Sequence, residues 1–112
     1  MADFSIDPIL AQVQAATGAD DRRGVYMETL FDWGDNYSEN LAASNDSEES
    51  VRARKAISDL WLSYAAMEIA LGEHDNAKQV FSDALEDQAA SLVAATYIQS
   101  AAYYLETDKV GG

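Results

Sequence analysis

Apolar side chains recur along this chain at the three- and four-residue spacing of amphipathic helices. Five segments carry such a stripe: Ile9, Leu10 and Val13; Val25, Tyr26, Leu30 and Trp33; Val51, Ile57, Leu60, Trp61, Tyr64, Met67 and Leu71; Ala77, Val80, Phe81, Ala84 and Leu85; and Val93, Tyr97, Ala101 and Tyr104. No segment alternates with period two for long enough to indicate a sheet. The pattern predicts an all-α fold with five helices, or six if Gly34 breaks the second.

Residues with capping chemistry set the expected helix ends. Asp7, which precedes the only proline, predicts a helix start, and Gly18 predicts the end of that helix. Asp46 and Glu49 have the spacing of a capping box at the start of the third helix, which Gly72 ends.

These signals divide the chain into successive helical hairpins. We expect a single helical domain over residues 1–107, with a hairpin at 7–43, a linker at 44–47, a second hairpin at 48–87, a last helix at 89–106 and a frayed tail at 108–112. The length suits one small domain that buries a core without disulfides.

The chain also contains an internal repeat. Residues 20–32 align with residues 75–87, so that the pair Val25-Tyr26 lies over the pair Val80-Phe81. Each segment follows a helix that is expected to end in glycine. Such helix–turn–helix units stack, because one pair of helices cannot cover its own apolar face.

The second copy of this repeat resembles a known family. Its first helix carries Trp61, Tyr64 and Glu68, and its second carries Ala77 followed by Val80 beside Phe81. This arrangement resembles a half-a-TPR (HAT) repeat, and several of its positions also fit the tetratricopeptide pattern. The resemblance implies stacked antiparallel hairpins whose repeat core includes Trp61, Tyr64, Glu68, Ala77, Val80, Phe81, Val25 and Tyr26. It also implies that Glu68 ties neighbouring helices together, and that the chain is a scaffold in an assembly such as one that processes RNA.

Composition excludes several classes of function. The chain of 112 residues has a net charge of −13, so we expect no nucleic-acid-binding surface and no docking on anionic lipid. It has no Cys, which excludes a disulfide framework and a thiol nucleophile. Without a secretory signal, we expect a soluble intracellular protein, in the nucleus if the HAT resemblance holds and otherwise in the cytoplasm.

Residues that carry chemistry are few. His74 is the only histidine and lies in an expected turn, with no nucleophile to serve. Two acidic clusters, residues 32–39 and 46–49, lack the spacing of a calcium loop. We therefore expect no enzyme activity, no cofactor and no metal site, and a small enzyme is the least favoured alternative.

The last helix is unusual because residues 88–105 carry no charge on any face. A helix that is apolar around its circumference is usually covered on several sides. We therefore expect a protein interface that includes Tyr97, Ile98, Tyr104 and Leu105. The partner is another protein or a second copy of this chain. Two alternatives remain: the helix inserts into the middle of this domain, or the chain is part of a longer array.

The distribution of charge leaves two functions open. No basic residue occurs between Arg23 and Arg52, where seven acids lie, so a basic partner is one reading and simple solubility is the other. We interpret the chain as a protein–protein interaction module in a multiprotein assembly. The alternative is a small acidic inhibitor that imitates nucleic acid and binds a basic nucleic-acid-binding protein.

Overall fold

Five α-helices make up most of the described part of this computed structural model. They are α1 (Ile6–Ala15), α2 (Ala19–Asn40), α3 (Glu48–Ala70), α4 (His74–Glu86) and α5 (Ala94–Gly111), with short 3₁₀ helices η1 (Ala42–Ser44) and η2 (Ala90–Leu92) in two connections. The structure describes residues 4–44 and 47–111, and none of these lies in a strand. The all-α prediction is therefore confirmed.

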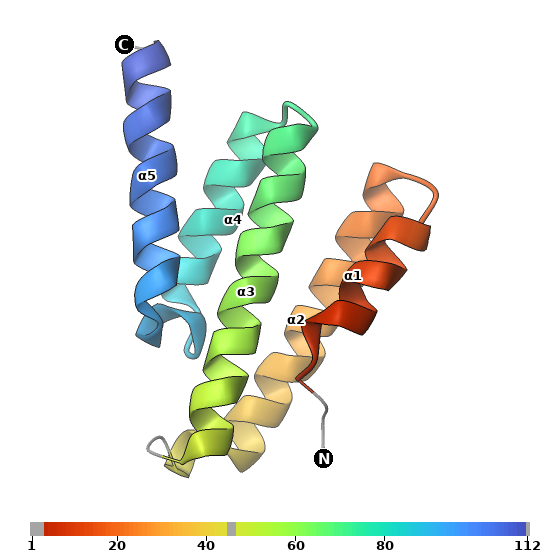
Figure 1. Cartoon of the computed structure of the whole chain (residues 1–112), viewed down its shortest axis with the longest axis vertical. Coiled ribbons are helices and arrows are strands. Elements are labelled where there is room, and N and C mark those ends of the chain that lie inside the picture. Colours follow the sequence, from red (N-terminus) through yellow and green to blue (C-terminus); the bar gives the residue numbers. More distant parts are fainter. Residues whose placement is uncertain (1–3, 45–46, 112) are drawn as a thin grey trace.

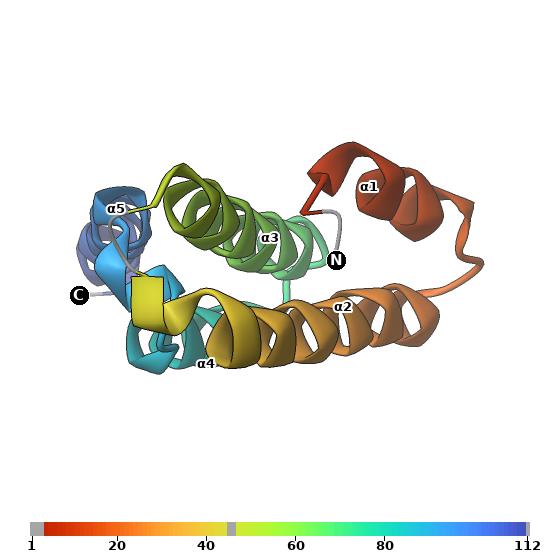
Figure 2. The same ribbon diagram turned by 90° about the horizontal axis from the view of Figure 1, so that it is seen from below.

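The helices form two layers and alternate in direction along the chain (Figure 1). Figure 2 shows α1, α3 and α5 in one layer and α2 with α4 in the other. The result is a flat molecule with extents of 43 × 31 × 17 Å. Because α3 contacts each of the other four helices, it is the centre of the fold.

The core follows the inner faces of α2, α3 and α4. Ala53, Ile57, Leu60 and Ala65 of α3 have no solvent exposure. Removing large apolar side chains such as Ile57 and Leu60 from water is the main favourable contribution to folding, at about 1.5–3 kcal/mol for each. Alanines at positions 53 and 65 allow the neighbouring helices to approach α3 closely.

The structure corrects the expected start and end of the first helix. α1 begins at Ile6 with Ser5 as its N-cap residue, so Asp7 lies in the first turn. There its carboxylate still faces the positive end of the helix. α1 ends at Ala15, and Gly18 is the N-cap residue of α2 with an ordinary extended backbone. The prediction that Gly18 ends α1 was wrong. Ala16, the C-cap residue, and Gly18 both have negative φ, so α1 does not end in a left-handed glycine.

Gly72 ends α3 as predicted. Its φ is +76°, a conformation that glycine adopts without a steric penalty. The backbone N–H of Gly72 donates to the Ile69 carbonyl, and that of Glu73 donates to the Glu68 carbonyl, at 3.0 and 2.9 Å. These two bonds are the Schellman pattern, which satisfies carbonyls at the helix end.

At its start α3 differs from the prediction. The cap is Ser47, whose hydroxyl oxygen accepts from the Ser50 backbone N–H at 3.1 Å. Asp46 lies outside the described residues. α2 continues through Gly34 to Asn40 without a break. The described residues therefore form five α-helices rather than six.

The last helix also begins later than predicted. The chain from Ala89 to Val93 forms a tight turn around η2, and α5 begins at Ala94 rather than at residue 89. Asp87 stabilises this turn, because its Oδ2 accepts from the backbone N–H groups of Ala89 and Ala90 at 2.9 and 2.8 Å. Residues 108–111 of the expected frayed tail belong to α5, and Gly112 lies outside the described residues.

Candidate protein interface

Most of the residues predicted to form the repeat core are buried. These are Tyr26, Tyr64, Glu68, Ala77, Val80 and Phe81, while Val25 and Trp61 are partly buried against the same core. The aligned residues Tyr26 and Phe81 are therefore equivalent in burial as well as in sequence. The rings of Tyr26 and Tyr64 stack in parallel with their centroids 5.1 Å apart.

Glu68 joins α3 to α2 through Arg23. The Arg23 guanidinium donates from Nε and Nη2 to the two carboxylate oxygens of Glu68, each at 2.8 Å. The Glu68 side chain is 1% exposed, so its charge needs such a partner. The bond to Glu68 raises the pKa of Arg23, against the opposing effect of burial. The sequence pattern drew attention to Glu68 but gave no sign that Arg23 is its partner.

This ion pair lies beside the stacked tyrosines. The Tyr26 hydroxyl is 2.7 Å from Ser63 Oγ, which adds a second polar link between α2 and α3. Burial raises the pKa of the Tyr64 phenol, and the Glu68 carboxylate raises it further. The region is thus a hydrogen-bonded junction between two helices.

One face of α5 holds the helix to the rest of the protein. Thr96, Ser100 and Tyr103 on this face are buried. The Thr96 and Ser58 hydroxyls lie 2.6 Å apart and join α5 to α3. The Tyr103 hydroxyl is 2.8 Å from Nδ1 of His74, which ties α5 to the start of α4. His74, the only histidine, therefore has a structural contact.

The opposite face of α5 is apolar and open to solvent. We call it the α5 outer face, and it consists of Ala94, Tyr97, Ile98, Ala101, Ala102 and Leu105, all exposed. Tyr97, Ile98 and Leu105 are 49, 64 and 63% exposed. Three of the four residues predicted at an interface therefore lie together on this surface.

Tyr104, the fourth predicted interface residue, lies at the edge of that face. It is partly buried against the core, and its hydroxyl donates to the Lys78 carbonyl at 3.3 Å. Its ring also meets that of Tyr103 edge-on, at a centroid distance of 6.1 Å. Tyr104 therefore helps to hold α5 on α4 rather than extending the α5 outer face.

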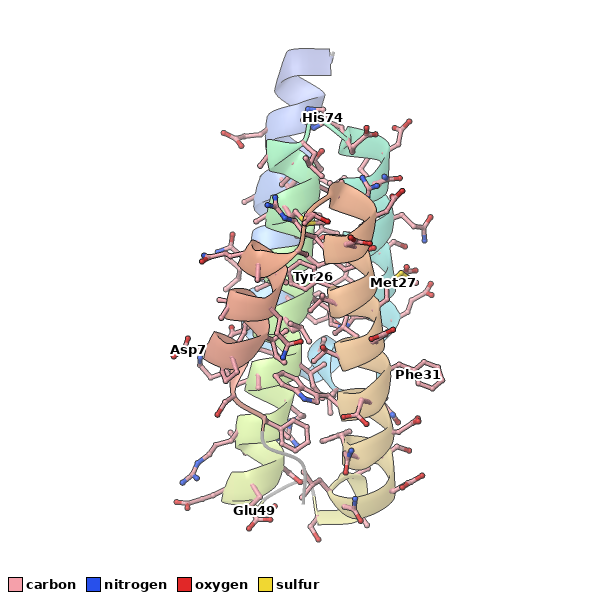
Figure 3. The ribbon with its side chains drawn as sticks, turned by 90° about the vertical axis from the view of Figure 1, so that its right-hand side faces the viewer. Asp7, Tyr26, Met27, Phe31, Glu49 and His74 are labelled. Carbon is pink, nitrogen blue, oxygen red and sulfur yellow. The ribbon has the colours of Figure 1, made fainter. Side chains whose placement is uncertain are left out.

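A second surface feature, which the sequence did not reveal, is a groove between α2 and α4. This α2–α4 groove has a volume of about 510 Å³, with Trp61 and Tyr64 of α3 in its floor. Met27 and Phe31 form the α2 side, and Gln79 and Asp83 form the α4 side. The ring of Phe31 projects away from the ribbon (Figure 3), and it is 75% exposed. The sequence holds one sign of this surface. Met27 and Phe31 are one helical turn apart and lie outside the apolar stripe that α2 buries.

No group of three or more His, Asp or Glu residues in the described part of the chain is placed to hold a metal ion. Among the same residues, no helix is long and apolar enough to cross a membrane. No protein-family model matches the chain, and neither curated proteins nor solved structures give a significant match. The HAT resemblance therefore rests on the quoted sequence positions and stays a prediction.

Proposed function

We propose that this chain is a non-enzymatic protein–protein interaction module that docks through the α5 outer face. The observation that supports this proposal is the exposure of Tyr97, Ile98 and Leu105 on one side of a helix segment without charge. Contiguous exposed apolar surface of this kind is a common feature of protein interaction sites. The opposite side of α5 is already used for contacts within the chain, so the outer face is free for a partner.

The chemistry of the surface supports one kind of partner over others. All 20 acidic residues lie outside residues 88–105, so the α5 outer face matches an apolar helical surface rather than a charged one. Its three alanines leave room for a neighbouring helix to approach closely. A second copy is disfavoured, since two chains that each carry a net charge of −13 repel each other as they come into contact. We therefore assign the face to a different protein that is neutral or basic.

The HAT resemblance suggests the setting. It favours a subunit of a large RNA-processing assembly, which would place the chain in the nucleus. A tetratricopeptide-like module would serve a wider range of assemblies, including cytoplasmic ones. The α5 outer face supports a protein contact in either setting.

The test compares two substitutions of matched chemistry. Ile98→Asp places a charge on the α5 outer face, whereas Val51→Asp places the same charge on α3 at a side chain that is also half exposed. Tagged wild-type and variant chains are used for affinity purification from the source cells, with quantitative mass spectrometry. We expect the partners of the wild type to be lost with Ile98→Asp and retained with Val51→Asp. Equal recovery with both variants would contradict the proposal, provided that circular dichroism shows both to be folded.

The alternative function, an acidic inhibitor that imitates nucleic acid, is favoured by one observation. Between Met27 and Asn40, α2 carries four acids and no base. Mimicry of a polyanion depends on charge, so its affinity would fall steeply with ionic strength. An apolar interface on α5 would persist. Binding measured from about 0.05 to 0.5 M salt therefore separates the two functions.

A further inference from the structure

We propose that the α2–α4 groove is a second binding site, which takes a basic amphipathic segment of a partner protein. An apolar side chain of that segment inserts beside Phe31 over Trp61, and an adjacent Lys or Arg pairs with Asp83. This site lies on a different part of the molecule from the α5 outer face, so it does not depend on the function proposed for that face.

The apolar half of the site is preformed. Met27 and Phe31 are 60 and 75% exposed on the α2 side, one helical turn apart. Beneath them, the Tyr64 ring is fixed by its parallel stack with Tyr26. Two large exposed side chains beside an aromatic floor offer a pocket for one bulky apolar residue.

The polar half of the site selects positive charge. Arg23 is the only basic residue that lines the groove in the described part of the chain, and its guanidinium is bonded to both Glu68 and Asp20. On the α4 side, Asp83 is exposed, and among the described residues it accepts a hydrogen bond only from the neutral Gln79 amide, at 2.9 Å. Among the described residues, no acid of α2 lines the groove, whereas Asp87 lines it beside Asp83. A Lys or Arg beside the apolar anchor therefore has the Asp83 carboxylate within reach.

The size of the groove limits the segment to a few residues. Gln88 Nε2 donates to the Gly34 carbonyl at 3.4 Å and joins the chain beyond α4 to α2. Arg23 and Glu68, which pair with each other, also line the groove. A volume of about 510 Å³ fits one or two side chains with their backbone.

The experiment uses a phage-displayed library of random 12-residue peptides, selected on the immobilised full chain. We expect enriched peptides to combine one large apolar residue with at least one Lys or Arg. Phe31→Ser should weaken the selected peptides roughly tenfold or more. Asp83→Asn should weaken them several-fold and reduce their salt dependence. Tyr97→Ser, on the α5 outer face, serves as the control and should leave their affinity unchanged.

Three results would overturn the proposal. They are enrichment of peptides without basic residues, equal binding of the selected peptides to the Phe31→Ser variant, and no enrichment over an unrelated immobilised protein. Two further results would also overturn it. Loss of binding in Tyr97→Ser alone would place the site on α5, and sedimentation showing dimers that Phe31→Ser dissociates would assign the groove to a second copy. Because all three substituted side chains are exposed, the variants are expected to fold, and circular dichroism checks this.

Discussion

Arg23 of α2 and Glu68 of α3 form a two-pronged ion pair, with both N–H···O distances at 2.8 Å. The pair fixes the position of α2 along α3, because a planar guanidinium and a carboxylate meet in this way at only one register. It also explains why a carboxylate is tolerated in the core, where the Glu68 side chain is 1% exposed. The floor of the α2–α4 groove depends on this junction.

We expect Glu68→Gln to destabilise the protein strongly. The amide cannot accept both hydrogen bonds, so the Arg23 charge loses its partner inside the junction. The melting temperature should fall by roughly 10 °C. Asp20→Asn is the control, because Asp20 bonds the same guanidinium but its side chain is 97% exposed. Thermal unfolding that shows equal losses for the two variants would contradict this role for Glu68.

A pair of buried hydroxyls links α3 to α5, and we expect the contributions of the two side chains to stability to depend on each other. Ser58 and Thr96 have no solvent exposure, and their hydroxyl oxygens are 2.6 Å apart. Either Ser58→Ala or Thr96→Val should cost about 1–3 kcal/mol, because the remaining hydroxyl is buried without its partner. The double variant should cost less than the sum of the two single variants. Additive losses in urea unfolding would show that the two hydroxyls do not depend on each other.

The turn before α5 depends on Asp87. Its Oδ2 accepts from two backbone N–H groups, those of Ala89 and Ala90. Asp87→Ala should reduce the free energy of unfolding by about 1 kcal/mol, as the loss of a helix cap does. Asp87→Asn retains an acceptor oxygen and should cost less. Glu86→Ala, at the exposed neighbouring position, should have almost no effect, and chemical denaturation of the three variants compares them directly.

Alkaline pH should destabilise the fold through two tyrosines. Burial raises the pKa of Tyr64, with a further rise from Glu68, and burial together with Asp75 raises the pKa of Tyr103. The folded state therefore favours the neutral phenols, and this stabilisation is intact below the unfolded pKa of about 10. It is lost as pH rises through the folded values. The free energy of unfolding should fall less steeply above about pH 10 in Tyr64→Phe and Tyr103→Phe, and an unchanged slope would contradict this.

The sequence predicted the helices well and their ends less well. Apolar spacing located each helix, and Gly72 marked the end of α3 because a positive φ strongly favours glycine. At the start of α1, Ser5 and Asp7 both have capping side chains, and the choice between them depends on where the helix meets the core. The turn at residues 89–93 was missed because its cap, Asp87, precedes the uncharged segment that suggested a helix.

Surface features were harder to predict than the core. The charge-free run predicted the exposed Tyr97, Ile98 and Leu105, because lack of charge can be read directly from sequence. Arg23 and Glu68 are 45 residues apart in the sequence. The pattern of a single sequence does not show which distant residues come into contact. Phe31 is 75% exposed because the other helices leave its face of α2 uncovered, which is a property of the packed helices.

The central claim is that a partner protein covers the α5 outer face, and site-specific photocrosslinking tests it most directly. Benzoyl-phenylalanine is introduced at Ile98 in one variant and at Val51 in another, and the chains are irradiated in extract from the source cells. We expect a discrete adduct with a different protein from position 98 and none from position 51. Equal adducts from both positions, no adduct from position 98, or an adduct with a second copy of the chain would contradict the claim.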